Sequence, residues 1–186
     1  MNRVDLLDAL VSEFKQEFAG YFLPNKDAVM QEVKVYSQYL PQPQNITYTE
    51  RERRGLAGYE ENDYATNFPC VIVRLEDMTD SEEGSTELCT VRVQVIAGVY
   101  DDTPESQGYR HILAMQDKIR LLLLDRRVIG RKFLLDMPVK SKLLDIETWP
   151  VWYGQQELTY HAGRPLQNWE YVHGGIKRIE KGSVRI

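Results

Sequence analysis

Hydrophobic residues at the start of the chain recur with the period of a helix. The apolar positions stand three or four residues apart and form one stripe: Leu7, Leu10, Val11, Phe14 and Phe18. Such spacing places these side chains on one face of an α-helix, which a globular protein buries. Asn2 is placed to cap the start of this helix, and Gly20 is placed to end it. The pattern therefore predicts a first helix that packs through one face.

Apolar runs in the next third of the chain predict strands. The stretch MQEVKVYSQYL, residues 30–40, predicts a short helix that passes into a strand. The stretch CVIVRL, residues 70–75, is rich in β-branched residues and predicts a strand that is buried on both faces. The acidic stretch EDMTDSEEGSTEL, residues 76–88, predicts a solvated connection in a hairpin.

The clearest pattern lies at residues 91–124. VRVQVIAGVY alternates apolar and polar residues, as a half-buried strand does, and a turn follows at residues 101–104. A long helix comes next, and its apolar positions share one side: Ile112, Met115, Ile119, Leu122 and Leu123. Both halves of this unit are patterned for packing, and neither contains a chemical motif.

The remaining segments are patterned more weakly. RKFLLD and KLLDIE predict two strands separated by a turn at Met137-Pro138, and QQELTYHA, residues 155–162, predicts a last sheet strand. Residues 41–69 contain Pro, Gly, Asn and charges but no sustained apolar period. A run of that length is typical of a binding loop, of an arm that orders on a partner or of a disordered segment.

Length and charge exclude several classes of function. A chain of 186 residues favours one domain, with a core at about residues 3–162 and an extension at residues 163–186. A net charge of −5 argues against a surface that grips nucleic acid, because such affinity comes largely from Lys and Arg. No apolar run is long enough to predict a membrane span, and the start does not resemble a signal peptide. Cys70 and Cys89 are therefore predicted to be reduced core thiols of a cytoplasmic protein.

Few residues are candidates for chemistry. His111, His161 and His173 lie in three different segments, and without HExxH or CxxC spacing a zinc site lacks its usual local ligand pair. The sharpest enzymatic candidate is the tripeptide Glu32-Val33-Lys34 on a predicted strand, with Asp27 upstream, which resembles the carboxylate and lysine pattern of metal-dependent nucleases. Asp27 stands too close in sequence to lie on a neighbouring strand. We therefore predict no catalytic residue, no metal and no cofactor.

Two groups of residues are candidates for an assembly interface. The first lies in the unpatterned segment, where Tyr and Arg alternate with acids: Tyr48, Arg51, Arg53, Arg54 and Tyr59. It is either a polar loop with self-compensating charge or a protein–protein arm, since Tyr and Arg are common interface anchors. The second is the aromatic group Trp149, Trp152 and Tyr153 around Pro150. It is either a peptide-binding cradle or one end of the core.

The order of these segments resembles a known family. The helix NRVDLLDALVSEF, the strand FPCVIVRL and above all VRVQVIAGVYDDTPESQGYRHILAMQDKIRLLLL are similar to segments of the tail terminator (tail completion) proteins of long-tailed bacteriophages and prophages. WPVWYGQQELTY resembles the closing Pro/aromatic turn and strand of that family. The resemblance covers roughly residues 3–162. Segment 41–67 is longer than the family's connection, and residues after 163 extend beyond its common core.

The resemblance implies both a fold and a function. The fold would be α+β, with one mostly antiparallel sheet and two helices packed on one face. The function would be structural and non-enzymatic: a ring, six-fold in the family, that caps the tail tube, stops its polymerisation and offers a surface for the head. The partners would be other copies of the chain, the tail tube protein and a neck protein, with DNA passing through the ring unbound. The chain would act in the virion tail, after assembly in the host cytoplasm. Another tail or neck component of the same fold is the first alternative, and a small metal-dependent nuclease or regulatory binding module is the second.

Overall fold

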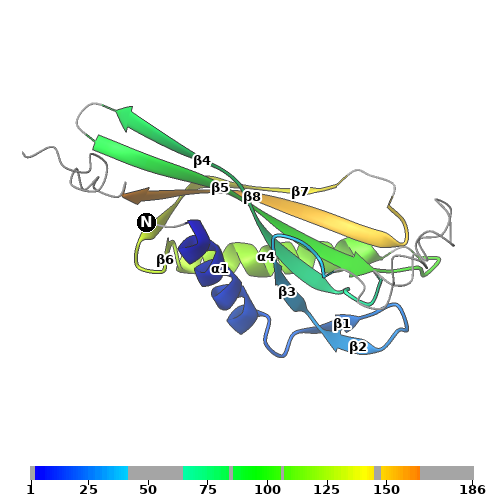
Figure 1. Ribbon diagram of the computed structural model, residues 1–186. Coiled ribbons are helices and arrows are strands. Elements are labelled where there is room, and N and C mark those ends of the chain that lie inside the picture. The colour runs from blue at the N-terminus through cyan, green and yellow to red at the C-terminus, as the bar shows by residue number, and fades with distance from the viewer. Residues whose placement is uncertain (1–2, 42–64, 84–85, 106, 145–147, 164–186) are drawn as a thin grey trace, which may run out of the picture.

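The computed structural model describes residues 3–41, 65–83, 86–105, 107–144 and 148–163. Two long helices and one large sheet dominate this part of the chain (Figure 1). The helices are α1 (Arg3–Glu17) and α4 (Gly108–Asp125), and the strands are β1 (Phe22–Pro24), β2 (Met30–Glu32), β3 (Lys34–Ser37), β4 (Cys70–Glu83), β5 (Thr86–Tyr100), β6 (Val128–Ile129), β7 (Phe133–Leu143) and β8 (Val151–Gly163).

The large sheet has the strand order β3-β4-β5-β8-β7-β6, and β1 and β2 form a small separate hairpin. Only β3 and β4 pair in parallel, and every other neighbouring pair in the described sheet is antiparallel. Both helices pack on the same face of this curled sheet (Figure 1). The predicted α+β fold, with one mostly antiparallel sheet and two helices on one face, is therefore confirmed.

The two helices form where the sequence predicts them. α1 buries Leu7, Leu10 and Phe14 of the predicted stripe, and it also buries Leu6, which the prediction did not include. The helix ends before Gly20, whose positive φ of 72° suits a residue without a Cβ. α4 buries its predicted apolar side, and Lys118 on α4 forms an ion pair with Glu17 on α1. The helices therefore contact the sheet through apolar faces and each other through charge.

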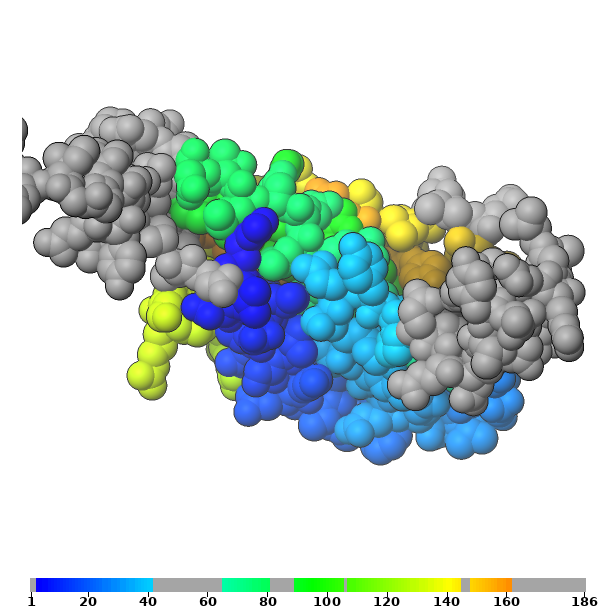
Figure 2. Space-filling view, viewed as in Figure 1, coloured from blue at the N-terminus to red at the C-terminus, as the bar shows by residue number. Residues whose placement is uncertain are grey.

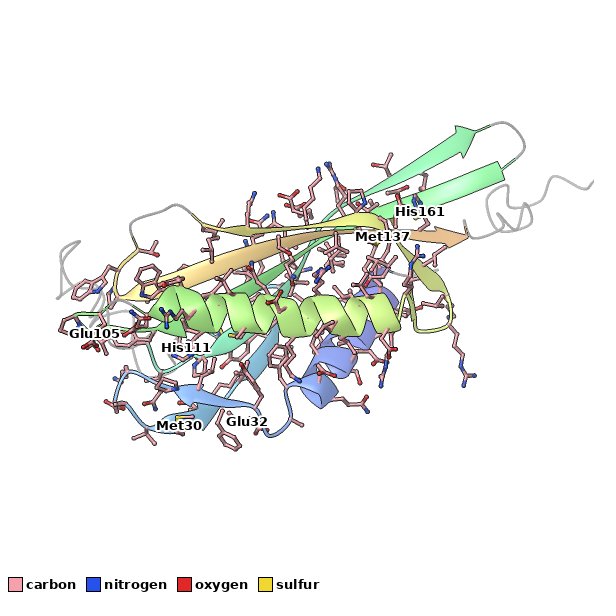
Figure 3. The ribbon with its side chains drawn as sticks, turned by 180° about the vertical axis from the view of Figure 1, so that it is seen from behind. Met30, Glu32, Glu105, His111, Met137 and His161 are labelled. Carbon is pink, nitrogen blue, oxygen red and sulfur yellow. The ribbon has the colours of Figure 1, made fainter. Side chains whose placement is uncertain are left out.

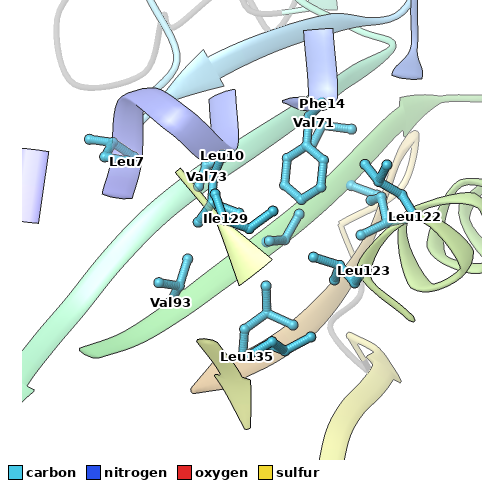
Figure 4. Close-up of a cluster of buried hydrophobic side chains, with 14 of the residues drawn as sticks. Leu7, Leu10, Phe14, Val71, Val73, Val93, Leu122, Leu123, Ile129 and Leu135 are labelled. Carbon is cyan, nitrogen blue, oxygen red and sulfur yellow. The ribbon is translucent and has the colours of Figure 1, made fainter. Parts of the chain in front are cut away.

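The main core lies between the helices and the sheet (Figure 4). The inward positions of β5 alternate along the strand and are all buried: Val91, Val93, Val95, Ala97 and Val99. They meet α1 through Phe14 and α4 through Leu123. Every second side chain of β5 thus points to the same face of the sheet, and the apolar faces of the two helices pack against that face.

Three segments differ from their predictions. Residues 30–37 form the short strands β2 and β3 rather than a helix that passes into a strand. The acidic stretch 76–83 continues β4, and residues 86–88 begin β5, so the predicted connection is mostly strand. The predicted turn at Met137-Pro138 is wrong, because β7 runs through these residues from Phe133 to Leu143 with a shift in its register there. A bulge absorbs the proline without ending the strand.

Tyr160 on β8 provides a test of the core. Its side chain is fully buried, and its hydroxyl has no hydrogen-bond partner among the described residues. Burying a hydroxyl without a partner costs about 1–3 kcal/mol. We expect Tyr160→Phe to leave the free energy of unfolding unchanged or to raise it by about 1 kcal/mol, as measured by denaturant unfolding at pH 7. A loss of stability would show that the hydroxyl is bonded in solution.

Candidate assembly surfaces

The two predicted interface groups have different outcomes. The group Tyr48, Arg51, Arg53, Arg54 and Tyr59 lies outside the described residues. The aromatic group is described, and its three side chains do not share one surface. Trp149 precedes β8 and is 62% exposed. Trp152 points to the helix side and lies beside Tyr109 at the start of α4, with 6.4 Å between ring centroids. Tyr153 points to the opposite side and meets Phe68 edge-on at 5.7 Å.

The neighbours of Trp152 and Tyr153 belong to two packing clusters. Trp152 packs against the main core between helices and sheet, and its indole N–H donates to the backbone carbonyl of Asp101 at 3.4 Å. Tyr153 belongs to a second cluster on the other face of the sheet, built on Phe68 and Cys70. Trp149 alone keeps most of its surface exposed. An interface role for this group stays a prediction.

The face of the sheet that points away from the helices, called the outer face below, carries charged pairs. Arg92 on β5 donates to Asp77 on β4 from both Nε and Nη2, with Nε 2.9 Å from Oδ1. This hydrogen bonding holds the pKa of Asp77 below its usual value. Lys142 on β7 donates to Glu157 on β8 at 3.0 Å and lowers the pKa of Glu157 in the same way. The outer face is therefore a ladder of exposed cross-strand pairs.

A hydroxyl, an imidazole and a carboxylate lie close together on this face, although Asp136 stands two residues along β7 from the position that pairs with His161. The Oγ1 atom of Thr90 lies 3.2 Å from Nδ1 of His161, and Nε2 of His161 lies 3.2 Å from Asp136. The hydrogen bond from His161 lowers the pKa of Asp136. Hydrolases use the same order of groups. Here the three residues are neighbours on β5, β8 and β7, and the bonds join three adjacent strands.

β4 presents an unpaired edge over most of its length. β3 pairs with β4 only as far as Val73, whose carbonyl also accepts the backbone N–H of Gln38 at 2.8 Å. Beyond that point, no described strand pairs with this side of β4. Residues 77–83 keep regular pairing with β5 on the other side. The green atoms of β4 lie at the molecular surface above α1 (Figure 2). Residues 76–83 contain five acids and no base.

β7 presents the other unpaired edge of the sheet. β6 pairs only with Phe133 and Leu134 of β7. The backbone N–H of Leu135 donates to the backbone carbonyl of Arg127 at 2.8 Å. Past Asp136, no described strand pairs with this side of β7. Residues 140–143 keep regular pairing with β8. They have the sequence KSKL, with two bases and no acid.

The predicted chemical candidates are dispersed. Glu32 ends β2 and accepts the backbone N–H of Gly20 at 2.6 Å, whereas Lys34 begins β3 in the large sheet and its Nζ donates to the carbonyl of Thr66 at 3.0 Å. The E-x-K tripeptide thus joins two sheets rather than lying on one strand. His111 and His161 lie toward opposite ends of α4 in the view of Figure 3, and His173 is outside the described residues. No group of His, Cys, Asp or Glu within the described part of the chain is arranged to hold a metal ion.

Comparisons with known proteins add no relative. No protein-family model matches the chain, and no curated protein matches it. Both cysteines are buried, and neither forms a disulfide. Within the ranges that the structure describes, no helix is both long enough and apolar enough to cross a membrane.

Proposed function

We propose that this chain is a structural protein that assembles into a ring and caps the tail tube of a long-tailed bacteriophage or prophage. The ring would stop polymerisation of the tube and provide the surface to which the head or neck attaches. The proposal draws on the resemblance of residues 3–162 to tail terminator proteins and on one structural observation. That observation is a sheet in which no described strand pairs with an acidic stretch at the edge of β4 or with a basic stretch at the edge of β7.

An unequal pair of edges suits a ring. A contact is heterologous when one patch of each copy binds a different patch of the next copy. Such contacts close into a ring if the rotation between successive copies adds up to a full turn. A symmetric dimer would instead need one patch that complements itself. Unpaired edges are also a hazard in a monomer, because they template pairing with other chains. Two such edges of opposite charge favour a protein that pairs with its own copies.

The net charge fits a ring through which DNA passes. The chain carries a formal charge of −5, and the outer face of the sheet contains nearly balanced pairs such as Arg92 with Asp77 and Lys142 with Glu157. DNA binds proteins tightly when Lys and Arg neutralise its phosphates and release their counterions. A lumen without excess positive charge would not bind DNA in this way. DNA would pass without specific binding, as the proposed role requires.

Electron microscopy of particles made without this gene tests the proposal. We expect tails that exceed their normal length and carry no head, because nothing stops the tube. The control is the same deletion complemented by the gene in trans, which should restore tail length and infectivity. Tails of normal length that fail to join heads would instead assign the chain to the neck. Intact virions would overturn a structural role, and the enzyme and regulator classes would then need testing.

A further inference from the structure

The two edges of the sheet that no described strand pairs with complement each other in charge. We propose that neighbouring copies join by antiparallel pairing of residues 77–83 of β4 in one copy with residues 140–143 of β7 in the next, so that one sheet continues from copy to copy. This inference deepens the proposed ring function and rests on it, because it names the surfaces that form the ring. The occupant of each edge is thus a second copy of this chain.

Strand directions allow this pairing. β4 is antiparallel to β5, β5 to β8, and β8 to β7, so β4 and β7 of one copy run in opposite directions. A rotation about an axis to which the strands are tilted, as in a barrel, keeps the two strands opposed where the copies meet. The β7 strand of the next copy therefore arrives antiparallel to β4, which is the geometry that ordinary ladder hydrogen bonds require.

The two edges are also offset along the strands. One row crosses the sheet through the paired residues Asp77, Arg92, Thr159 and Asp136. The unpaired stretch of β4 lies on one side of this row, and the unpaired stretch of β7 lies on the other. Joining them shifts each copy along the strand direction. Closed sheets need such a stagger, because their strands tilt relative to the barrel axis.

Charge selects this pairing over the two symmetric ones. Asp77 on the β4 edge faces outward beside Arg92, and Lys140 and Lys142 on the β7 edge also face outward, beside Glu157. Pairing β4 with β7 would bring the acidic stretch of β4, with Asp77 outward, to the strand that carries the two lysines. Pairing β4 with β4 would put acids against acids, and pairing β7 with β7 would put lysines against lysines. Like charges directly opposite each other destabilise a sheet, so only the unequal pairing is favoured.

On the helix side, each edge carries one partly exposed apolar side chain, and the β4 edge also carries Asp80. Met78 pairs with the buried Val91 and is 39% exposed, and Leu143 pairs with Gly154 beneath α4 and is 41% exposed. A new β4–β7 contact would place these two side chains on the same side of the joined sheet. It would thus cover apolar surface on the helix side while charges pair on the outer side.

Cysteine cross-linking in the full-length chain tests the pairing. Thr79 on β4 and Lys140 on β7 are both exposed on the outer face. We expect a chain carrying Thr79→Cys and Lys140→Cys, treated with a short bis-maleimide, to give a ladder of covalent oligomers up to a closed ring. The matched control pairs Thr79→Cys with Leu121→Cys, at a side chain of α4 that is 64% exposed. The edge pair should react at least about ten-fold more than this control, because pairing raises the local thiol concentration.

Mixing the single variants tests the direction of the contact. Thr79→Cys mixed with Lys140→Cys should give a cross-linked dimer and nothing larger, and neither variant alone should cross-link. Unmodified protein reports the background of the two buried native thiols. Cross-linking of Thr79→Cys with itself, or an edge pair no more reactive than the control, overturns the inference. A full ladder of cross-linked oligomers, together with intact virions after deletion of the gene, would support the pairing and refute the tail function. Overlong tails after deletion of the gene, without cross-links between the edges, would support the tail function and refute the pairing.

Discussion

Replacing Gly154 with alanine is expected to lower the free energy of unfolding by about 3 kcal/mol, the cost of overpacking a tight contact. Gly154 lies on β8 where α4 crosses the sheet. A Cβ at this position would stand 2.6 Å from Nε2 of Gln116 and would also strike Cγ2 of Ile112. Gln116 is held in place, because its Nε2 donates to the backbone carbonyls of Lys142 at 3.0 Å and Gln155 at 3.2 Å. Neither neighbour can withdraw without losing a contact, so α4 must shift outward. Denaturant unfolding measures the loss.

Gly20 provides the matched control for this substitution. Its φ is +72°, and a Cβ there would meet nothing within 4 Å. Gly20→Ala therefore carries only the conformational cost of the left-handed region, about 1 kcal/mol. A loss at Gly154 that is clearly larger than the loss at Gly20 would assign the difference to the packing of α4 on β8. Equal losses would show that α4 sits less tightly on the sheet than the structure indicates.

The sequence predicted those elements whose burial is periodic. α1, α4 and β5 each bury one face against the main core, so the period of their apolar residues is visible in the chain. The acidic part of β4 was predicted as a loop because it has no such period. Its backbone pairs with β5, but the side chains of residues 76–80 all reach solvent. Strands held mainly by ladder hydrogen bonds leave little trace in hydrophobicity.

The candidate surfaces were less predictable than the fold. The unpaired edges of β4 and β7 depend on strand order, which brings together segments far apart in the chain, and no local motif records that order. Trp152 and Tyr153 are adjacent in sequence, yet strand alternation sends them to opposite faces of the sheet. The one available signal was charge, because acids cluster at residues 76–83 and lysines at residues 140–142. The opposite charges of the two segments predict an interface only when both segments are known to lie at edges of the sheet.

Alkaline conditions are expected to destabilise the protein through the cluster on the outer face. Cys70 is fully buried there, and burial raises its pKa from 9.0 to about 12, despite the opposing charge of Lys34. Burial likewise raises the pKa values of Tyr36 and Tyr153 from 10.0 to about 12. Below the unfolded pKa values, each group is protonated in both states and its contribution to stability is fully present. As the pH rises further, the unfolded groups ionise while the folded groups stay protonated, so stability falls until the pH reaches the folded pKa.

The size of this loss follows from the shift at Cys70. Each pH unit above 9.0 lowers the free energy of unfolding by about 1.4 kcal/mol through this thiol, which amounts to about 3 kcal/mol at pH 11. The tyrosines add to the loss above pH 10. Denaturant unfolding between pH 8 and pH 11 measures it, and Cys70→Ala is the control, because it removes the titrating thiol. In the unfolded chain Cys70 ionises at lower pH than the tyrosines. Between pH 9 and pH 10 the variant should therefore lose less stability than the original chain. An unchanged pH dependence in the variant would show that the Cys70 thiol is not the group that couples this face of the sheet to pH.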